Sequence, residues 1–147
     1  MNSKDQPFFV GQKAFIRNSE NKLLVLLDEF AGLDLPGGKV QSDEEDLKAS
    51  LKREVEEETG LEIIVGDVFH TWRFHYPIEK LDIDLQDSRT NGNIYRVGYF
   101  CKLENAENVT LSNEHVEYRW ITQEDLPGLK SWGGDYQAVE IYFQKLN

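Results

Sequence analysis

The stretch Ser42–Leu61, "SDEEDLKASLKREVEEETGL", carries the signals of an amphipathic helix at both of its ends. Ser42 and Glu45 stand three residues apart and match a capping box, and Gly60 provides a C-terminal stop. An apolar stripe about 80° wide on the helical wheel would face the core, and it consists of Leu47, Leu51 and Val55. The stretch therefore predicts a helix that packs by this stripe against the rest of the fold.

Acidic residues crowd the last two turns of this predicted helix, at Glu54, Glu56, Glu57 and Glu58. With Leu47 placed at zero, Glu58 falls at about 20°, Glu54 at about −20° and Glu57 at about −80°, and only Glu56 points away. Like charges at these spacings repel by about 0.2–0.5 kcal/mol per pair, and anions in the last turn oppose the helix dipole. Because a hard divalent cation reverses both effects, the pattern predicts a metal site beside the buried face.

The segment Gly37–Leu61 resembles the signature of the Nudix hydrolase family. The signature begins with a glycine, five residues of any kind, a glutamate and seven further residues. It ends with Arg-Glu, an aliphatic residue, any residue, Glu-Glu, any residue, a glycine and an aliphatic residue. Residues 53–61 match this second part position by position. Gly38 and Glu45 are separated by six residues, so either this loop is one residue longer or Glu44 takes the role of the first glutamate. For Glu45, the capping box is the competing role.

The resemblance implies an α+β fold, an α/β/α sandwich around a mixed β-sheet, formed by a single domain of residues 1–147. It also implies hydrolysis of a diphosphate linkage in a nucleoside diphosphate derivative, with Mg²⁺ as the cofactor and Mn²⁺ as its substitute. Arg53 would orient the carboxylates of the site. The metal ligands implied within the motif are a backbone carbonyl at Gly37 and the side chains of Glu54, Glu57 and Glu58.

A carboxylate outside the helix is expected to complete the site, and the candidates are Glu114, Glu117 and Glu124. In the family a distal glutamate often stands six residues before a tryptophan, which is the spacing from Glu114 to Trp120. Glu117 falls within a predicted strand, and Glu124 falls in a predicted first helical turn, where an acid is ordinary. Glu114 is therefore the expected further metal ligand or general base. The catalytic residues expected are Arg53, Glu54, Glu57 and Glu114.

The rest of the chain alternates predicted strands and helices. A hairpin is predicted from strands at 12–17 and 22–28, further strands at 61–78, 93–103 and 116–121, a short helix at 122–126 and a terminal helix at 135–147. The strand at 93–103 is predicted to bury the face of Tyr95, Tyr99 and Cys101. Its polar face carries Arg96 and Lys102, which would either contact phosphate or protect an exposed strand edge.

Composition excludes several classes of protein. The formal net charge of −11 and the pI near 4.7 argue against a nucleic-acid binder that neutralises phosphates. An anionic ligand would need positive charge from elsewhere, which a bound metal would supply. Without a signal peptide or a long apolar run, a cytoplasmic protein with no membrane partner is expected. Cys101, the only cysteine, is expected to be a small core residue. No oligomeric state is predicted.

The expected partner is a small-molecule nucleotide. Nucleoside triphosphates are the leading substrate prediction, followed by ADP-ribose or a nucleotide sugar. The alternative from a different class is a Nudix-like module that binds nucleotides without hydrolysis. Such a module would be expected to have a broken motif, whereas the segment from Arg53 to Glu58 is intact.

Overall fold

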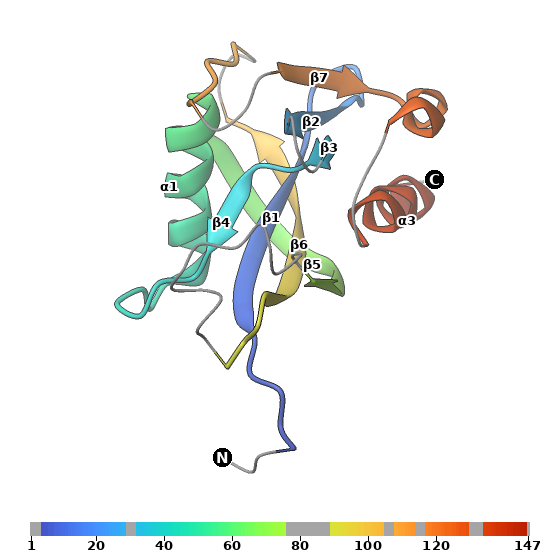
Figure 1. Cartoon of the computed structure of the whole chain (residues 1–147). Coiled ribbons are helices and arrows are strands. Elements are labelled where there is room, and N and C mark those ends of the chain that lie inside the picture. The colour runs from blue at the N-terminus through green and yellow to red at the C-terminus, as the bar shows by residue number, and fades with distance from the viewer. Residues whose placement is uncertain are drawn as a thin grey trace.

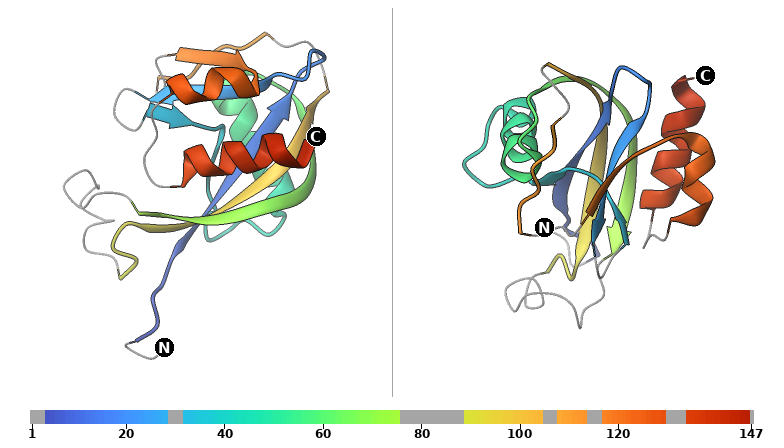
Figure 2. Two further views of the ribbon diagram at one scale, coloured as in Figure 1. Left: turned by 90° about the vertical axis from the view of Figure 1, so that its right-hand side faces the viewer. Right: turned by 90° about the horizontal axis from the view of Figure 1, so that it is seen from above.

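The computed structural model describes residues 4–28, 32–75, 89–104, 108–113, 117–129 and 134–146. Within these residues the strands form one seven-stranded sheet, and helices cover both of its faces. Helix α1 (Leu47–Thr59) lies on one face, and α3 (Asp135–Leu146) with the short 3-10 helix η2 (Gln123–Gly128) lies on the other (Figures 1 and 2). This arrangement confirms the predicted α/β/α sandwich with a mixed sheet.

The elements alternate along the chain much as the sequence predicts, and η2 and α3 confirm the short and terminal helices. Their bounds, in chain order, are β1 Phe9–Arg17, β2 Leu23–Asp28, β3 Gly32–Asp34, β4 Gly37–Lys39, α1 Leu47–Thr59, β5 Ile63–His75, β6 Asn93–Leu103, β7 Glu117–Ile121, η2 Gln123–Gly128 and α3 Asp135–Leu146. No helix among the described residues is long and apolar enough to cross a membrane.

The sheet has the order β3-β2-β1-β6-β5, with β4 paired to β1 and β7 paired to β2. Strands β1 and β6 pair in parallel, and the other pairs are antiparallel. The predicted hairpin is confirmed. Its turn is held by the Asn18 side chain, whose Oδ1 accepts hydrogen bonds from the amides of Glu20 and Lys22. The parallel pair places β1 in the middle of the sheet, and helices on either side cover both of its faces.

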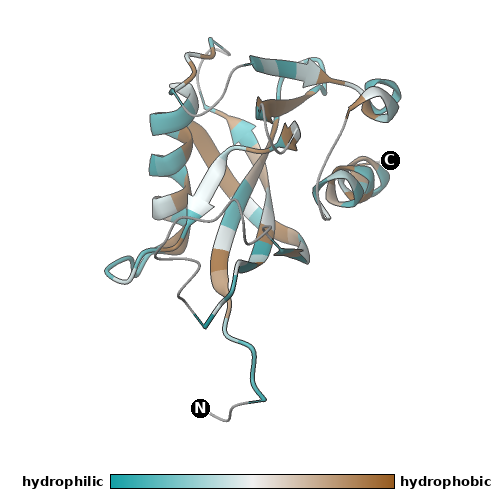
Figure 3. Cartoon of the chain, in the orientation of Figure 1, coloured by the Kyte–Doolittle hydropathy of each residue, from teal (hydrophilic) through white to brown (hydrophobic). Residues whose placement is uncertain are grey.

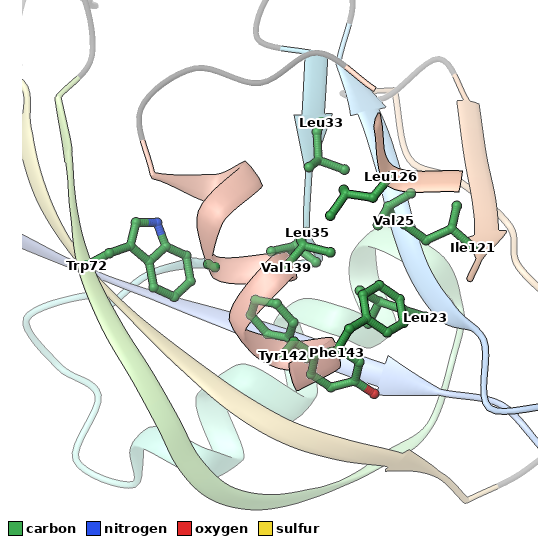
Figure 4. Packing of buried hydrophobic residues seen from close by; sticks show 12 residues of the cluster. Leu23, Val25, Leu33, Leu35, Trp72, Ile121, Leu126, Val139, Tyr142 and Phe143 are labelled. Carbon is green, nitrogen blue, oxygen red and sulfur yellow. The ribbon is translucent and has the colours of Figure 1, made fainter. Parts of the chain in front are cut away.

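Alternating side chains of β1 enter two separate cores. Ala14 and Ile16 pack with Leu51 and Val55 of α1, whereas Phe15 packs with residues of α3. The α3-side cluster is the larger one, and its buried residues join β1, β2, β3, β5 and β7 to η2 and α3 (Figure 4). Apolar residues accordingly run along the strands, while the visible surface of α1 is largely hydrophilic (Figure 3).

Helix α1 begins later than the capping box predicts. Its N-cap is Asp46, whose side chain accepts a hydrogen bond from the amide of Ala49, so the predicted box of Ser42 and Glu45 is wrong. The physical reason is a separate turn before the helix, in which the Glu44 carboxylate accepts a hydrogen bond from the Gln41 amide at 2.7 Å. The predicted stop is confirmed, because Gly60 adopts the left-handed conformation at φ 73°.

Two predictions about buried faces are also corrected. Leu47 is 39% exposed although the apolar stripe included it, because it is the first residue of α1 and a helical side chain leans toward the N-terminus, past the start of the helix; Leu51 and Val55 are fully buried. In β6, Tyr95 is 42% exposed and Arg96 is buried. Arg96 therefore does not protect an edge, since β6 lies between β1 and β5 and both of its faces are covered. Cys101 is buried, as predicted.

Candidate functional site

A buried glutamine fixes the start of α1 over the sheet. The Gln12 side chain of β1 is enclosed, and its Nε2 donates a hydrogen bond to the carbonyl of Leu47 at 2.8 Å. Its Oε1 accepts a hydrogen bond from the Tyr99 hydroxyl of β6, also at 2.8 Å. Strands β1 and β6 are thus tied to the first turn of α1, which sets how the glutamates of the later turns meet β4.

Glu58 is buried, with 7% of its surface exposed, as its place on the helical wheel predicts. Its Oε1 accepts a hydrogen bond from the amide of Gly37 at 2.8 Å. Gly37 has φ 148°, and a Cβ atom there would lie 1.9 Å from the carbonyl oxygen of Gln12. Only glycine can therefore bring the backbone of β4 close to the Glu58 carboxylate.

Glu54 lies one helical turn before Glu58 and meets the next residue of β4. A Cβ atom on Gly38 would lie 2.9 Å from Oε2 of Glu54. The Glu54 side chain is 25% exposed, so it is more accessible to solvent than the buried Glu58. Together the two glycines of β4 let the chain approach two carboxylates of α1 side by side.

Arg53 links three acidic residues, one on the loop before α1 and two on the helix itself. Its Nη1 donates to Oε1 of Glu57 at 2.9 Å, and its Nη2 donates to Oε2 of Glu44 at 2.9 Å and to Oε1 of Glu54 at 3.4 Å. Hydrogen bonds from the Ser50 hydroxyl and the Gln41 amide, followed by that from Arg53, lower the pKa of Glu44 to about 2. The same carboxylates, with Glu44 first, raise the pKa of Arg53.

This network bears on the two alternatives for the first glutamate of the motif. Glu44 is the residue that pairs with Arg53, and its side chain is only 11% exposed. Glu45 is exposed. The extra residue in the loop is accommodated by the turn at Gln41–Glu44, which turns the Glu44 side chain back toward α1.

The segment 108–113 covers the C-terminal end of α1. The amide of Thr110 donates to the carbonyl of Thr59 at 2.8 Å, and the amide of Ser112 donates to the carbonyl of Glu58 at 3.0 Å. These bonds satisfy two carbonyl groups that a helix end leaves without partners. Two residues further along the sequence stands Glu114, which lies outside the described residues.

The two other candidates for the distal carboxylate, Glu117 and Glu124, lie within the described residues. Glu117 is exposed at the start of β7, and its Oε2 accepts a hydrogen bond from Nε of Arg119 at 2.6 Å. Glu124 is exposed in the first turn of η2. Within the described part of the chain, neither carboxylate forms a hydrogen bond or ion pair with a residue of α1 or β4.

The donor atoms around β4 suit a hard divalent cation. The carboxylates of Glu54 and Glu58 and the backbone of Gly37 and Gly38 offer the oxygen ligands that Mg²⁺ prefers. Among the described residues, however, no three acidic, histidine or cysteine side chains converge as a metal-binding group. Unlike Glu54 and Glu58, Glu57 does not lie against β4; its carboxylate is paired with Arg53 and its side chain is 58% exposed.

Sequence reasoning missed the buried polar groups that position these elements. On the α3 face, Nζ of Lys13 lies 3.1 Å from Oδ1 of Asp34 and also donates to the carbonyl of Leu35. Gln12 and Lys13 together are the signal in the sequence, because two adjacent polar residues interrupt an otherwise apolar central strand.

A second buried ion pair fastens α3 to the sheet. Nη1 of Arg96 lies 2.6 Å from Oδ2 of Asp135, and the guanidinium lies 3.8 Å from the centre of the Phe74 ring. Nε1 of Trp72 donates to Oδ1 of the same aspartate at 2.9 Å. Trp72 and Phe74 are both buried beside this ion pair.

Comparison with known proteins identifies relatives along most of the chain. The family model described as the NUDIX domain matches residues 7–140. An 8-oxo-dGTP diphosphatase from Buchnera aphidicola subsp. Schizaphis graminum is 36% identical over 115 residues, which cover 78% of this chain and 71% of that protein.

Solved structures resemble the fold over nearly its whole length. The MutT protein from Methanosarcina mazei Go1 superposes with a TM-score of 0.73 at 28% identity, and the match covers 99% of both chains. An ADP-ribose pyrophosphatase from Streptococcus suis superposes with a TM-score of 0.65 at 18% identity, covering 96% of this chain and 93% of that one. At that lower identity the second likeness shows the fold alone.

Proposed function

Because this chain belongs to the Nudix hydrolase family, whose members act on phosphoric anhydrides of nucleoside diphosphate derivatives, we propose that it is a Mg²⁺-dependent pyrophosphohydrolase of nucleoside triphosphates. Mn²⁺ would substitute for Mg²⁺. The observation that carries the proposal is the approach of Glu54 and Glu58 to the two glycines of β4. A helix with these carboxylates on its inner side is unfavourable by itself and becomes favourable around a cation.

We assign the metal ligands to the carboxylates of Glu54, Glu57 and Glu58, to a backbone carbonyl at Gly37, and to Glu114. When bound, the cation would neutralise the charge of the diphosphate and activate and align the attacking water. Glu58 is held by the Gly37 amide and Glu54 stands against Gly38, so both residues are already ordered. Glu57 would have to leave Arg53, whose guanidinium keeps Glu44 as its second partner.

Arg53 therefore acts as a positioning residue in this proposal. Its guanidinium joins Glu44, on the loop before α1, to Glu57, on the last turn. While Glu57 is paired in this way, its charge is balanced in the metal-free protein. Arg53 thus stabilises the acidic helix before the cation binds and orients the carboxylates afterwards.

Glu114 is proposed as the general base, which takes a proton from the attacking water. Its support is the family spacing to Trp120 together with the attachment of Ser112 to the carbonyl of Glu58. Glu114→Gln should then lower kcat much more than it changes KM. Glu117→Gln serves as the matched control, because Glu117 is exposed and paired with Arg119. A crippled Glu117→Gln beside an unimpaired Glu114→Gln would refute the assignment.

The nucleoside triphosphate is proposed as substrate because the 36% identical relative is named for a diphosphatase that acts on one. The test is a panel of nucleotides incubated with Mg²⁺ and resolved by product. Nucleoside triphosphates should yield a nucleoside monophosphate and pyrophosphate at the highest kcat/KM. ADP-ribose and a nucleotide sugar are the comparison substrates, and a phosphomonoester should remain uncleaved. Faster cleavage of ADP-ribose would reassign the substrate, and binding of every nucleotide without turnover would identify a non-catalytic module.

A further inference from the structure

A cluster of positive charge lies on the α3 face of the sheet, at the ends of β1 and β6. Arg17 and Lys102 are direct register partners in the parallel pair of these strands. They follow Phe15 and Phe100 by two residues, and both aromatic residues pack in the α3-side core, so both cations project to that face. Like charges on directly opposite residues of neighbouring strands repel each other. A negative charge close to Arg17 and Lys102 would therefore be stabilising.

A third cation reaches the same place from the last turn of α3. Lys145 lines one cavity together with Arg17 and Lys102. A lysine at the end of a helix is favourable to the helix dipole, which accounts for Lys145 by itself. The helix dipole does not explain why this lysine lies beside Arg17 and Lys102, which already repel each other.

The cavity between these cations is large enough for a small molecule and has apolar walls. Its volume is about 440 Å³, within the range of about 300–1,000 Å³ typical of ligand pockets. Phe100 and Tyr142 form aromatic walls, and Ile64 and Leu146 stand at 55% and 37% exposure. No carboxylate is among its lining residues in the described chain.

The three cations are also without partners in the part of the chain that the structure describes. Among the described residues, the side chains of Arg17, Lys102 and Lys145 make no ion pair and no hydrogen bond. Six other basic residues do pair with carboxylates, namely Lys13, Lys22, Lys52, Arg53, Arg96 and Arg119. Since the chain has 27 acidic and only 16 basic residues, a carboxylate would be the ordinary neighbour of any cation.

We propose that this cavity binds a small organic anion, with a phosphate, sulfonate or carboxylate group attached to a flat apolar body. The anionic group would lie among Arg17, Lys102 and Lys145, and the body would contact Phe100 and Ile64. The cavity is separate from the carboxylates of α1, because it opens on the opposite face of the sheet.

The test is a fluorescence titration with anilinonaphthalene sulfonate, a flat aromatic anion, in EDTA and without nucleotide. The parent protein should bind it saturably at one site. The double variant Lys102→Gln/Lys145→Gln should bind it at least about tenfold more weakly, because the attraction of two cations is lost. Lys22→Gln is the matched control, since it also removes a lysine charge but lies outside the cavity, and it should bind like the parent.

Competition identifies the chemistry of the natural ligand. A nucleoside monophosphate should displace the probe, whereas the uncharged nucleoside should not, and displacement by inorganic phosphate alone would show that the anionic group suffices. Lys102→Arg should retain binding. The absence of saturable binding, or equal binding by the parent and the double variant with a native circular dichroism spectrum, would overturn the proposal. Because no divalent cation or turnover is involved, neither result depends on the proposed hydrolysis.

Discussion

On the α1 face of the sheet, Arg53 is half exposed and divides its guanidinium between Glu44 and Glu57, whereas on the α3 face Arg96 is buried and bound to Asp135. Both arginines neutralise acids beside a helix. The exposed network can exchange partners at little cost, because water can solvate any group that is released. The buried pair cannot, because an uncompensated charge would remain in the core. The first arrangement suits a site that must admit a cation, and the second suits the attachment of a helix.

The largest effect is expected from breaking the buried pair. Arg96→Met should lower the free energy of unfolding by about 3–5 kcal/mol, because it leaves the Asp135 carboxylate buried without its partner. Chemical denaturation measures this difference. Arg119→Met is the matched control, since the exposed pair with Glu117 should contribute less than about 1 kcal/mol. Equal losses in the two variants would contradict the comparison.

The next effect is on catalysis and tests the exchange of partners by Glu57. Glu57→Gln should lower turnover by about a hundredfold, because it removes a proposed charged ligand of the cation. Its unfolding temperature should stay close to that of the parent, since the Glu57 side chain is 58% exposed. Steady-state kinetics at saturating Mg²⁺ and a thermal melt provide the two measurements. Undiminished turnover would remove Glu57 from the metal site.

A smaller effect is expected at the glycine that faces Glu54. Gly38→Ala should lower the affinity for Mg²⁺ by about tenfold, because the added methyl group would displace the Glu54 carboxylate. The affinity is measured from the dependence of turnover on Mg²⁺ concentration. Gly128→Ala is the control, as a Cβ atom at that position meets no neighbour within 4 Å. An unchanged Mg²⁺ dependence in Gly38→Ala would show that this approach does not shape the metal site.

The smallest effect concerns the acid end of the pH range. Folding lowers the pKa of Glu44 from 4.5 to about 2, chiefly through hydrogen bonds from Ser50 and Gln41. A lowered pKa gives a contribution to stability that is present above pH 4.5 and is lost as the pH falls toward 2. Glu44→Gln should therefore melt below the parent at neutral pH, and the difference should close between pH 4.5 and 2. A constant difference across that range would contradict the role of the Glu44 charge.

Local sequence signals predicted the elements well and the inner face of α1 in part, since Leu51, Val55 and Glu58 are buried whereas Leu47 and Glu57 are exposed. Gly60 ends the helix, and Glu58 is buried where the helical period places it, because both features depend on residues only a few positions away. The start of the helix was predicted wrongly. Ser42 and Asp46 are both good N-caps, and the hydrogen bond of Glu44 to the Gln41 amide decides between them by forming a turn before the helix.

The role of Arg96 could not be predicted from its neighbours in the sequence. An arginine in an alternating strand looks the same at an edge and in the middle of a sheet. Its burial follows from the parallel pairing of β6 with β1 and from Asp135, which is 39 residues away along the chain. Gln12 was missed for the same reason, as its partners are Tyr99 and the first turn of α1.

The parallel pairing at the centre of the sheet also sets an order for folding. Phe9 is the register partner of Ile94, 85 residues later, so β1 cannot complete its central hydrogen-bonded ladder until most of the chain has left the ribosome. The hairpin of β1 and β2 can form early, whereas closing so long a loop is slow. During synthesis, the unpaired side of β1 is therefore a surface that chaperones or other nascent chains can contact, until β6 arrives to cover it.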